Sequence, residues 1–112
     1  MPYRNEVLDV EAFIEYVEFL RSKYTKEYNE HKSHSVKEKQ EHLGMLAVLN
    51  TLLDTFNYYN FKDELTMKLV KKIVINYYKE LSKEKKTDAH YGKMLALGLV
   101  KDYLVNDKLS LR

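Results

Sequence analysis

The most apolar stretch of this chain reads MLAVLNTLLDTF and extends from Met45 to Phe56. At 100° per residue its large apolar side chains fall on one side of a helix, and Asn50, Thr51 and Asp54 fall on the other. This apolar arc is about 160° wide, broader than the ~100° of a helix that lies on a single neighbour. We therefore predict that this stretch is the central helix of the core and that it contacts at least two other helices.

The composition of the 112 residues favours a single all-α domain over residues 1–112. Three glycines and one proline are too few for the many turns of an all-β fold. An apolar content of 45% beside 32% charged residues argues against disorder. The chain has no cysteine, which excludes disulfides, thiolate metal sites and cysteine nucleophiles.

The composition also suggests a location and an origin. Residues 1–9 are polar, unlike a signal peptide, and no apolar run reaches the ~18 residues of a membrane span. With the lack of cysteine, this leads us to expect a cytoplasmic protein without membrane association. The abundance of Lys, Asn, Tyr and Ile suggests an AT-rich coding sequence, as in low-GC bacteria, their phages and plasmids.

Helical periodicity in the rest of the chain predicts a four-helix antiparallel, up-down bundle. The expected elements are a short N-terminal arm over 1–8 and helices over about 10–30, 36–57, 61–82 and 88–105. Ser35 and Glu38 form a capping-box pattern before the second helix, in which each side chain satisfies a backbone donor. Asn60 and Thr87 are expected to cap the third and fourth helices. The short connections favour antiparallel neighbours.

Two segments of the chain share a short pattern. His42-Leu43-Gly44-Met45-Leu46-Ala47-Val48 resembles His90-Tyr91-Gly92-Lys93-Met94-Leu95-Ala96-Leu97, with one insertion. The similarity is consistent with two stacked helical hairpins, and also with chance similarity between two apolar helices.

Surplus apolar residues on the first and last helices predict a surface that binds a protein. In a simple bundle these two helices are neighbours, and large exposed apolar patches mark partner sites. Alternatively the bundle is not a simple square, and the same residues contact a second neighbour inside it. Self-association as a homodimer is the simplest form of partner binding. The candidate residues are Tyr16, Phe19, Tyr91, Met94 and Leu95.

The lysines of the third helix predict a different surface. Phosphate groups of nucleic acid would be attracted to four side chains on one helix face, Lys68, Lys71, Lys72 and Lys79. A net charge of +2 and the scarcity of arginine do not favour this alternative. The other interpretation is an ordinary solvated helix face.

Histidines offer a third candidate site. The connections between helices 1 and 2 and between helices 3 and 4 would lie at the same end of an up-down bundle. Imidazole and carboxylate groups can bind zinc, iron or manganese. The weak metal candidates gathered at this end are His31, His34, Glu38, His42 and His90, and the Glu-x-x-His pairs of di-iron bundles are absent.

His90 and Lys93 also resemble part of a histidine phosphotransfer domain. Such domains are four-helix bundles of about this size, with a solvent-facing His and a Lys three positions later. The resemblance implies a phosphorylated imidazole stabilised by the nearby cation. The alternative is a surface His–Lys pair without such a role.

No motif of nucleophilic or nucleotide chemistry is present, so we expect a non-enzymatic protein without a cofactor. By size, charge and helix count the chain resembles bacteriocin immunity proteins and small phage-encoded regulators. That resemblance implies an inhibitor, adaptor or immunity-type protein that acts by binding another protein.

Overall fold

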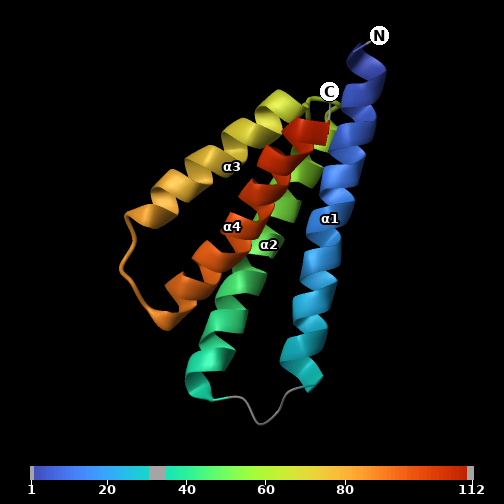
Figure 1. The fold of residues 1–112 in the computed structure, drawn as a ribbon. Helices are drawn as coiled ribbons and strands as arrows, with labels where there is room; N and C mark the ends of the chain where they lie inside the picture. The colour runs from blue at the N-terminus through green and yellow to red at the C-terminus, as the bar shows by residue number, and fades with distance from the viewer. Residues whose placement is uncertain (1, 31–34, 111–112) are drawn as a thin grey trace.

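The computed structural model describes residues 2–30 and 35–110, and their side chains over 9–30 and 35–105. The described chain folds into four helices and contains no strand. They are α1 (Pro2–Glu30), α2 (Val36–Phe61), α3 (Met67–Ser82) and α4 (Asp88–Ser110), and consecutive helices run in opposite directions (Figure 1). The predicted all-α four-helix fold is thus confirmed.

Four predicted helix boundaries were wrong. α1 begins at Pro2, so the predicted arm over residues 2–8 is helical; proline suits a first helical position because its missing N–H needs no partner there. α2 continues to Phe61 instead of residue 57, and α3 begins at Met67 instead of residue 61. α4 extends to Ser110, beyond the predicted end at 105.

The turn between α2 and α3 explains the misplaced boundary. Asn60 lies inside α2 and caps nothing; Asp63 ends the helix in a left-handed conformation, with φ of 58°. The Asp63 N–H donates to the Asn60 carbonyl (3.0 Å) and the Glu64 N–H to the Tyr59 carbonyl (2.9 Å). This is a Schellman end, which usually has glycine at the left-handed position. Because aspartate occupies this position instead of glycine, the sequence pattern did not reveal the end of α2.

The other helix starts follow the expected capping chemistry. The Ser35 hydroxyl accepts from the Glu38 N–H (3.2 Å) and the Glu38 carboxylate accepts in return, so the predicted capping box is confirmed. The Thr87 hydroxyl accepts from the His90 N–H (3.1 Å), as predicted. Thr66, which the sequence analysis did not single out, caps α3 by accepting from the Leu69 N–H (3.1 Å).

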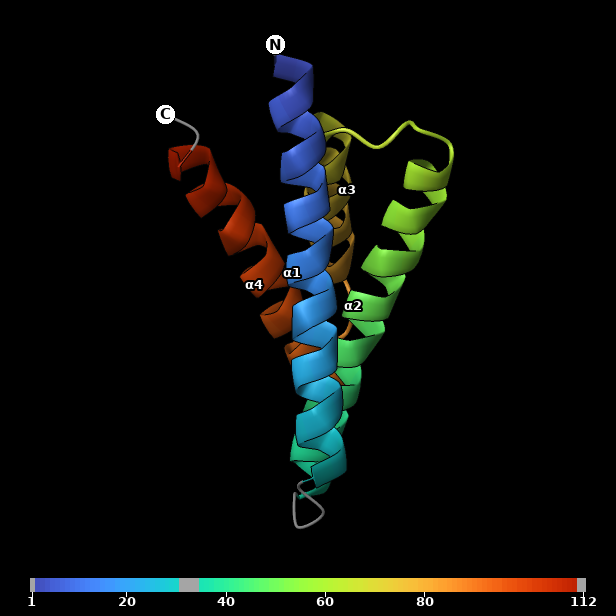
Figure 2. The same cartoon turned by 90° about the vertical axis from the view of Figure 1, so that its right-hand side faces the viewer.

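The closest helix pair is α2 and α4, which run in parallel and diverge from a tight crossing near their first turns (Figure 2). Glycines make this approach possible. A Cβ added to Gly44 would overlap the carbonyl oxygen of Ala89, and a Cβ added to Gly92 would overlap that of Glu41. Each carbonyl lies three residues before the opposite glycine, so the crossing has local two-fold symmetry. The pattern shared by the two segments marks equivalent positions in this crossing.

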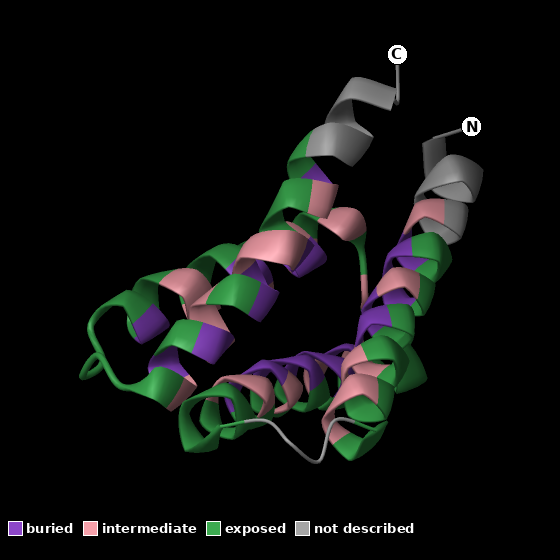
Figure 3. Ribbon diagram, turned by 60° about the horizontal axis from the view of Figure 1, so that its bottom comes forward, coloured by how far each residue is buried: buried purple, intermediate pink, exposed green. Residues whose placement is uncertain are grey.

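The bundle is therefore not a simple square, and the expectation that α1 and α4 are direct neighbours needs correction. In Figure 1 the α2–α4 pair lies between α1 and α3, and these two outer helices also contact each other. The backbones of α1 and α4 stay farther apart, and aromatic side chains bridge them: the rings of Phe13 and Tyr103 have centroids 5.7 Å apart. Buried residues line the inner sides of the helices (Figure 3).

The predicted central helix is the core of the molecule. Leu49 and Val48 are fully buried, and α2 packs against both α1 and α4. Phe56 meets the ring of Phe13 edge to face at 5.3 Å. None of the helices in the described ranges has the length and hydropathy that crossing a membrane requires.

Candidate interaction surfaces

The predicted α1/α4 surface is partly exposed. Phe19 is 60% exposed, Tyr91 57% and Leu95 43%. Tyr16 is instead half-buried, with its ring stacked on that of Tyr103 at a centroid distance of 4.4 Å and an interplanar angle of 17°. Tyr16 thus belongs to the contact between α1 and α4, whereas three other candidates leave apolar surface uncovered.

Met94 and Leu95 come together in a shallow apolar groove of about 380 Å³, called here the α1/α4 groove. α1 and α2 each supply one lining residue, and the rest come from α4. The lining residues are Tyr24, Met45, Met94, Leu95, Gly98, Leu99 and Asp102. The sequence analysis did not single out Tyr24 and Leu99 for this surface; they are half-buried and pack against the core at its edge, whereas Met45 belongs to the core itself.

Tyr16 lies in an environment that disfavours its ionised form. Burial raises the pKa of the Tyr16 phenol above its ordinary value of 10.0, and the neighbouring Tyr24 and Asp102 raise it further. Folding therefore favours the neutral form of the Tyr16 phenol.

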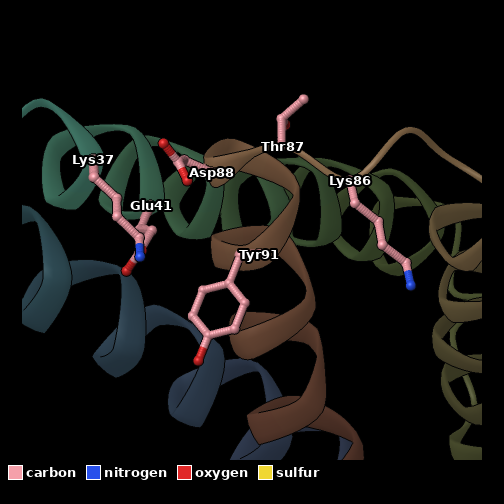
Figure 4. Close-up of a pocket in the computed structure, with 6 residues that line it drawn as sticks. All are labelled: Lys37, Glu41, Lys86, Thr87, Asp88 and Tyr91. Atoms are coloured by element: carbon pink, nitrogen blue, oxygen red, sulfur yellow. The ribbon is translucent and has the colours of Figure 1, made fainter.

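Tyr91 lies apart from this groove, beside a depression between the first turns of α2 and α4. Lys37, Glu41 and Asp88 gather on one side of the depression, whereas Lys86 and Thr87 point away from the Tyr91 ring (Figure 4). The polar groups do not converge on one point, so the depression does not assemble a set of reacting groups.

Most of the predicted lysine surface is exposed on α3. Lys68, Lys72 and Lys79 are exposed, and Lys71 is half-buried. No acidic residue occurs between residues 65 and 79, so this face of α3 is uniformly basic.

Lys71 lies at a second apolar groove, about 220 Å³ in volume, called here the α3/α4 groove. Aliphatic side chains of both helices form its floor, and one lysine from each helix stands at its rim. The Lys101 ammonium also lies 4.5 Å from the centre of the Tyr78 ring. The lining residues are Lys71, Val74, Ile75, Lys101, Leu104 and Val105. The sequence analysis found the lysines of α3 but not the groove, which requires the tertiary contact with α4.

The candidate histidines do not form a metal site in the part of the chain with a described structure, where no three His, Asp or Glu residues come close enough to hold an ion. His31 and His34 lie outside the described residues. His42 is half-buried: its Nδ1 lies 3.0 Å from the Glu38 carbonyl and its Nε2 lies 3.6 Å from the Glu27 carboxylate. This histidine joins α1 and α2.

His90 is not solvent-facing, contrary to what the phosphotransfer interpretation requires. Its side chain is 8% exposed, and its Nε2 lies 2.7 Å from the Leu81 carbonyl, to which it donates. Lys93, its expected partner, lies 3.6 Å from the Glu84 carboxylate. His90 connects the end of α3 to the start of α4, which is a structural role.

A comparison of this chain with known protein families, curated proteins and solved structures finds no match. The geometry of the two apolar grooves is therefore the main support for any function.

Proposed function

We propose that this protein is a small non-enzymatic interaction module that binds another protein molecule through the α1/α4 surface. The observation that carries the proposal is the exposure of large apolar side chains: Leu95 lines the α1/α4 groove, and Phe19 is exposed on α1 outside this groove. Phe19 and Leu95 together leave two large side chains in water, although the chain buries a complete core elsewhere. A partner that covers them would gain about 25 cal/mol for each Å² of apolar area removed from water.

The nearly apolar circumference of α4 supports the same proposal. One side of α4 contributes Ala96, Leu97 and Val100 to the core. The opposite side still presents large parts of Tyr91 and Leu95 to solvent. The composition adds support for an adaptor, inhibitor or immunity-type protein of a low-GC bacterium, phage or plasmid.

The test is the double variant Phe19→Lys with Leu95→Lys, studied by sedimentation velocity and circular dichroism. We expect the helical signal to persist and concentration-dependent association to disappear. A matched control is Val36→Lys with Phe61→Lys, which places the same charges on exposed apolar residues at the two ends of α2. Unfolding of the double variant would contradict the proposal. A wild-type monomer at every concentration would restrict it to a foreign partner.

A further inference from the structure

The charges of this protein are segregated between two helices. Residues 9–20 of α1 contain Asp9, Glu11, Glu15 and Glu18 and no lysine or arginine. Residues 65–79 contain Lys68, Lys71, Lys72 and Lys79 and no aspartate or glutamate. A net charge of +2 for the whole chain conceals these two opposite surfaces. The two charged segments lie on different helices, and the α2–α4 pair lies between them in Figure 1.

The outer side of α1 combines acidic and apolar groups. Glu11, Glu15 and Glu18 are all exposed, and the exposed Phe19 directly follows Glu18. These residues form the acidic face, a convex ridge on the side of α1 that points away from the core. An exposed aromatic side chain on a helix can anchor that helix in an apolar groove, and the carboxylates of Glu15 and Glu18 lie beside it.

The α3/α4 groove has the complementary chemistry. Its aliphatic floor matches an aromatic ring, and Lys71 and Lys101 at the rim match carboxylates. Its volume of about 220 Å³ lies below the roughly 300–1,000 Å³ of small-molecule pockets, so it is suited to a single side chain.

We propose that copies of this chain associate head to tail, with the acidic face of α1 in one copy seated on the α3/α4 groove of the next. Phe19 enters the groove, and Glu15 and Glu18 meet Lys71 and Lys101. The proposal rests on the proposed function, since Phe19 belongs to the α1/α4 surface, and it names the partner as a second copy. Two different complementary surfaces form open chains or rings instead of a closed two-fold dimer.

A nucleic acid fits the α3/α4 groove less well. Phosphates need extended cationic contacts, whereas the floor of this groove is formed by Val74, Ile75, Leu104 and Val105. Apolar surface between the lysines contributes nothing to phosphate binding but favours a side chain such as Phe19.

The test is a charge swap in the full chain, followed by sedimentation velocity at low and high salt. The acidic-face variant is Glu15→Lys with Glu18→Lys, and the groove variant is Lys71→Glu with Lys101→Glu. Each should weaken self-association about tenfold or more, because like charges then meet. An equal mixture of the two variants should restore association, since each then complements both surfaces of the other. High salt should weaken the wild-type association by screening.

Controls separate this proposal from its alternatives. Lys85→Glu with Lys86→Glu makes the same change in charge on exposed residues away from the groove, and should leave association intact. If circular dichroism shows that the groove variant unfolds, the single variant Lys101→Glu replaces it, because Lys101 is exposed.

Three outcomes would overturn the head-to-tail contact. The first is that the wild type is a monomer at every concentration. The second is that this monomer binds duplex DNA through the groove lysines. The third is an association that resists both charge reversals and is abolished by Leu95→Lys alone. That result would leave the proposed function intact, because Leu95 lies in the α1/α4 groove and not in the inferred contact.

Discussion

Gly44 of α2 and Gly92 of α4 occupy equivalent positions at the crossing of the two central helices. Each faces a backbone carbonyl of the opposite helix, of Ala89 and Glu41 respectively, at a place where a Cβ would overlap it. Neither glycine has a positive φ, so glycine is required here by close approach and not by backbone conformation.

Gly44→Ala and Gly92→Ala should therefore each destabilise the protein by about 3 kcal/mol or more, at the upper end of overpacking costs, because the atoms in the way belong to backbone and cannot rotate aside. Gly98 supplies the matched control. A Cβ there meets no atom within 4 Å, so Gly98→Ala should stabilise α4 by about 0.5–1 kcal/mol through helix propensity. Urea unfolding measures all three. Equal effects at Gly44 and Gly98 would contradict the close crossing.

Leu49 tests the central position of α2. Its side chain is fully buried, and truncation to Ala removes contacts and leaves a cavity, which typically costs about 2–5 kcal/mol. We expect Leu49→Ala to lower the free energy of unfolding within this range. A loss below about 1 kcal/mol would mean that the core can close around the smaller side chain.

His90 tests the connection between α3 and α4. His90→Ala removes the donor to the buried Leu81 carbonyl and leaves a void, so we expect a loss of about 2–4 kcal/mol in stability. His42→Ala is the control and should cost less, because His42 is only half-buried. After incubation of the wild type with acetyl phosphate, mass spectrometry should find no phosphoryl group on His90. An adduct there would show that the α3–α4 connection opens.

Asp63 tests the left-handed end of α2. Non-glycine residues pay about 1–2 kcal/mol in this conformation, with aspartate among the more tolerant. Asp63→Gly should therefore stabilise the protein by up to about 1 kcal/mol, measured by thermal unfolding. Asp63→Val should destabilise it, since a β-branched side chain is poorly accommodated at positive φ. A stabilising valine would contradict the φ of 58°.

The raised pKa of Tyr16 predicts that the free energy of unfolding depends on pH in the alkaline range. Because the folded state raises the pKa of this phenol above 10.0, its contribution is fully present below pH 10 and is lost as pH rises through the higher folded value. Tyr16→Phe should remove this part of the alkaline decline, which urea unfolding across alkaline pH would show. Asp102→Asn should lower the pKa of Tyr16, which can be followed by ultraviolet titration of the phenol. An unchanged alkaline decline in Tyr16→Phe would contradict this assignment.

The sequence by itself determined the helical class, the central helix and two of the helix starts. Helical periodicity, the capping box at Ser35 and the cap at Thr87 each depend on residues a few positions apart in the chain. They can therefore be recognised from the sequence alone. The end of α2 was not predicted because Asp63 adopts the left-handed conformation that glycine usually adopts at a helix end. The exposed lysines of α3 were also found locally, since they alternate with an apolar stripe.

Only the tertiary structure decided which helices touch. The sequence could not show that α2 and α4, two helices apart along the chain, would cross at Gly44 and Gly92, since a glycine gives no sign of its distant neighbour. The contact between α3 and α4 forms the α3/α4 groove, which no single helix contains. The tertiary structure also buries His90 against the Leu81 carbonyl. The sequence could not show this, because the exposure of a side chain depends on neighbours that are distant along the chain.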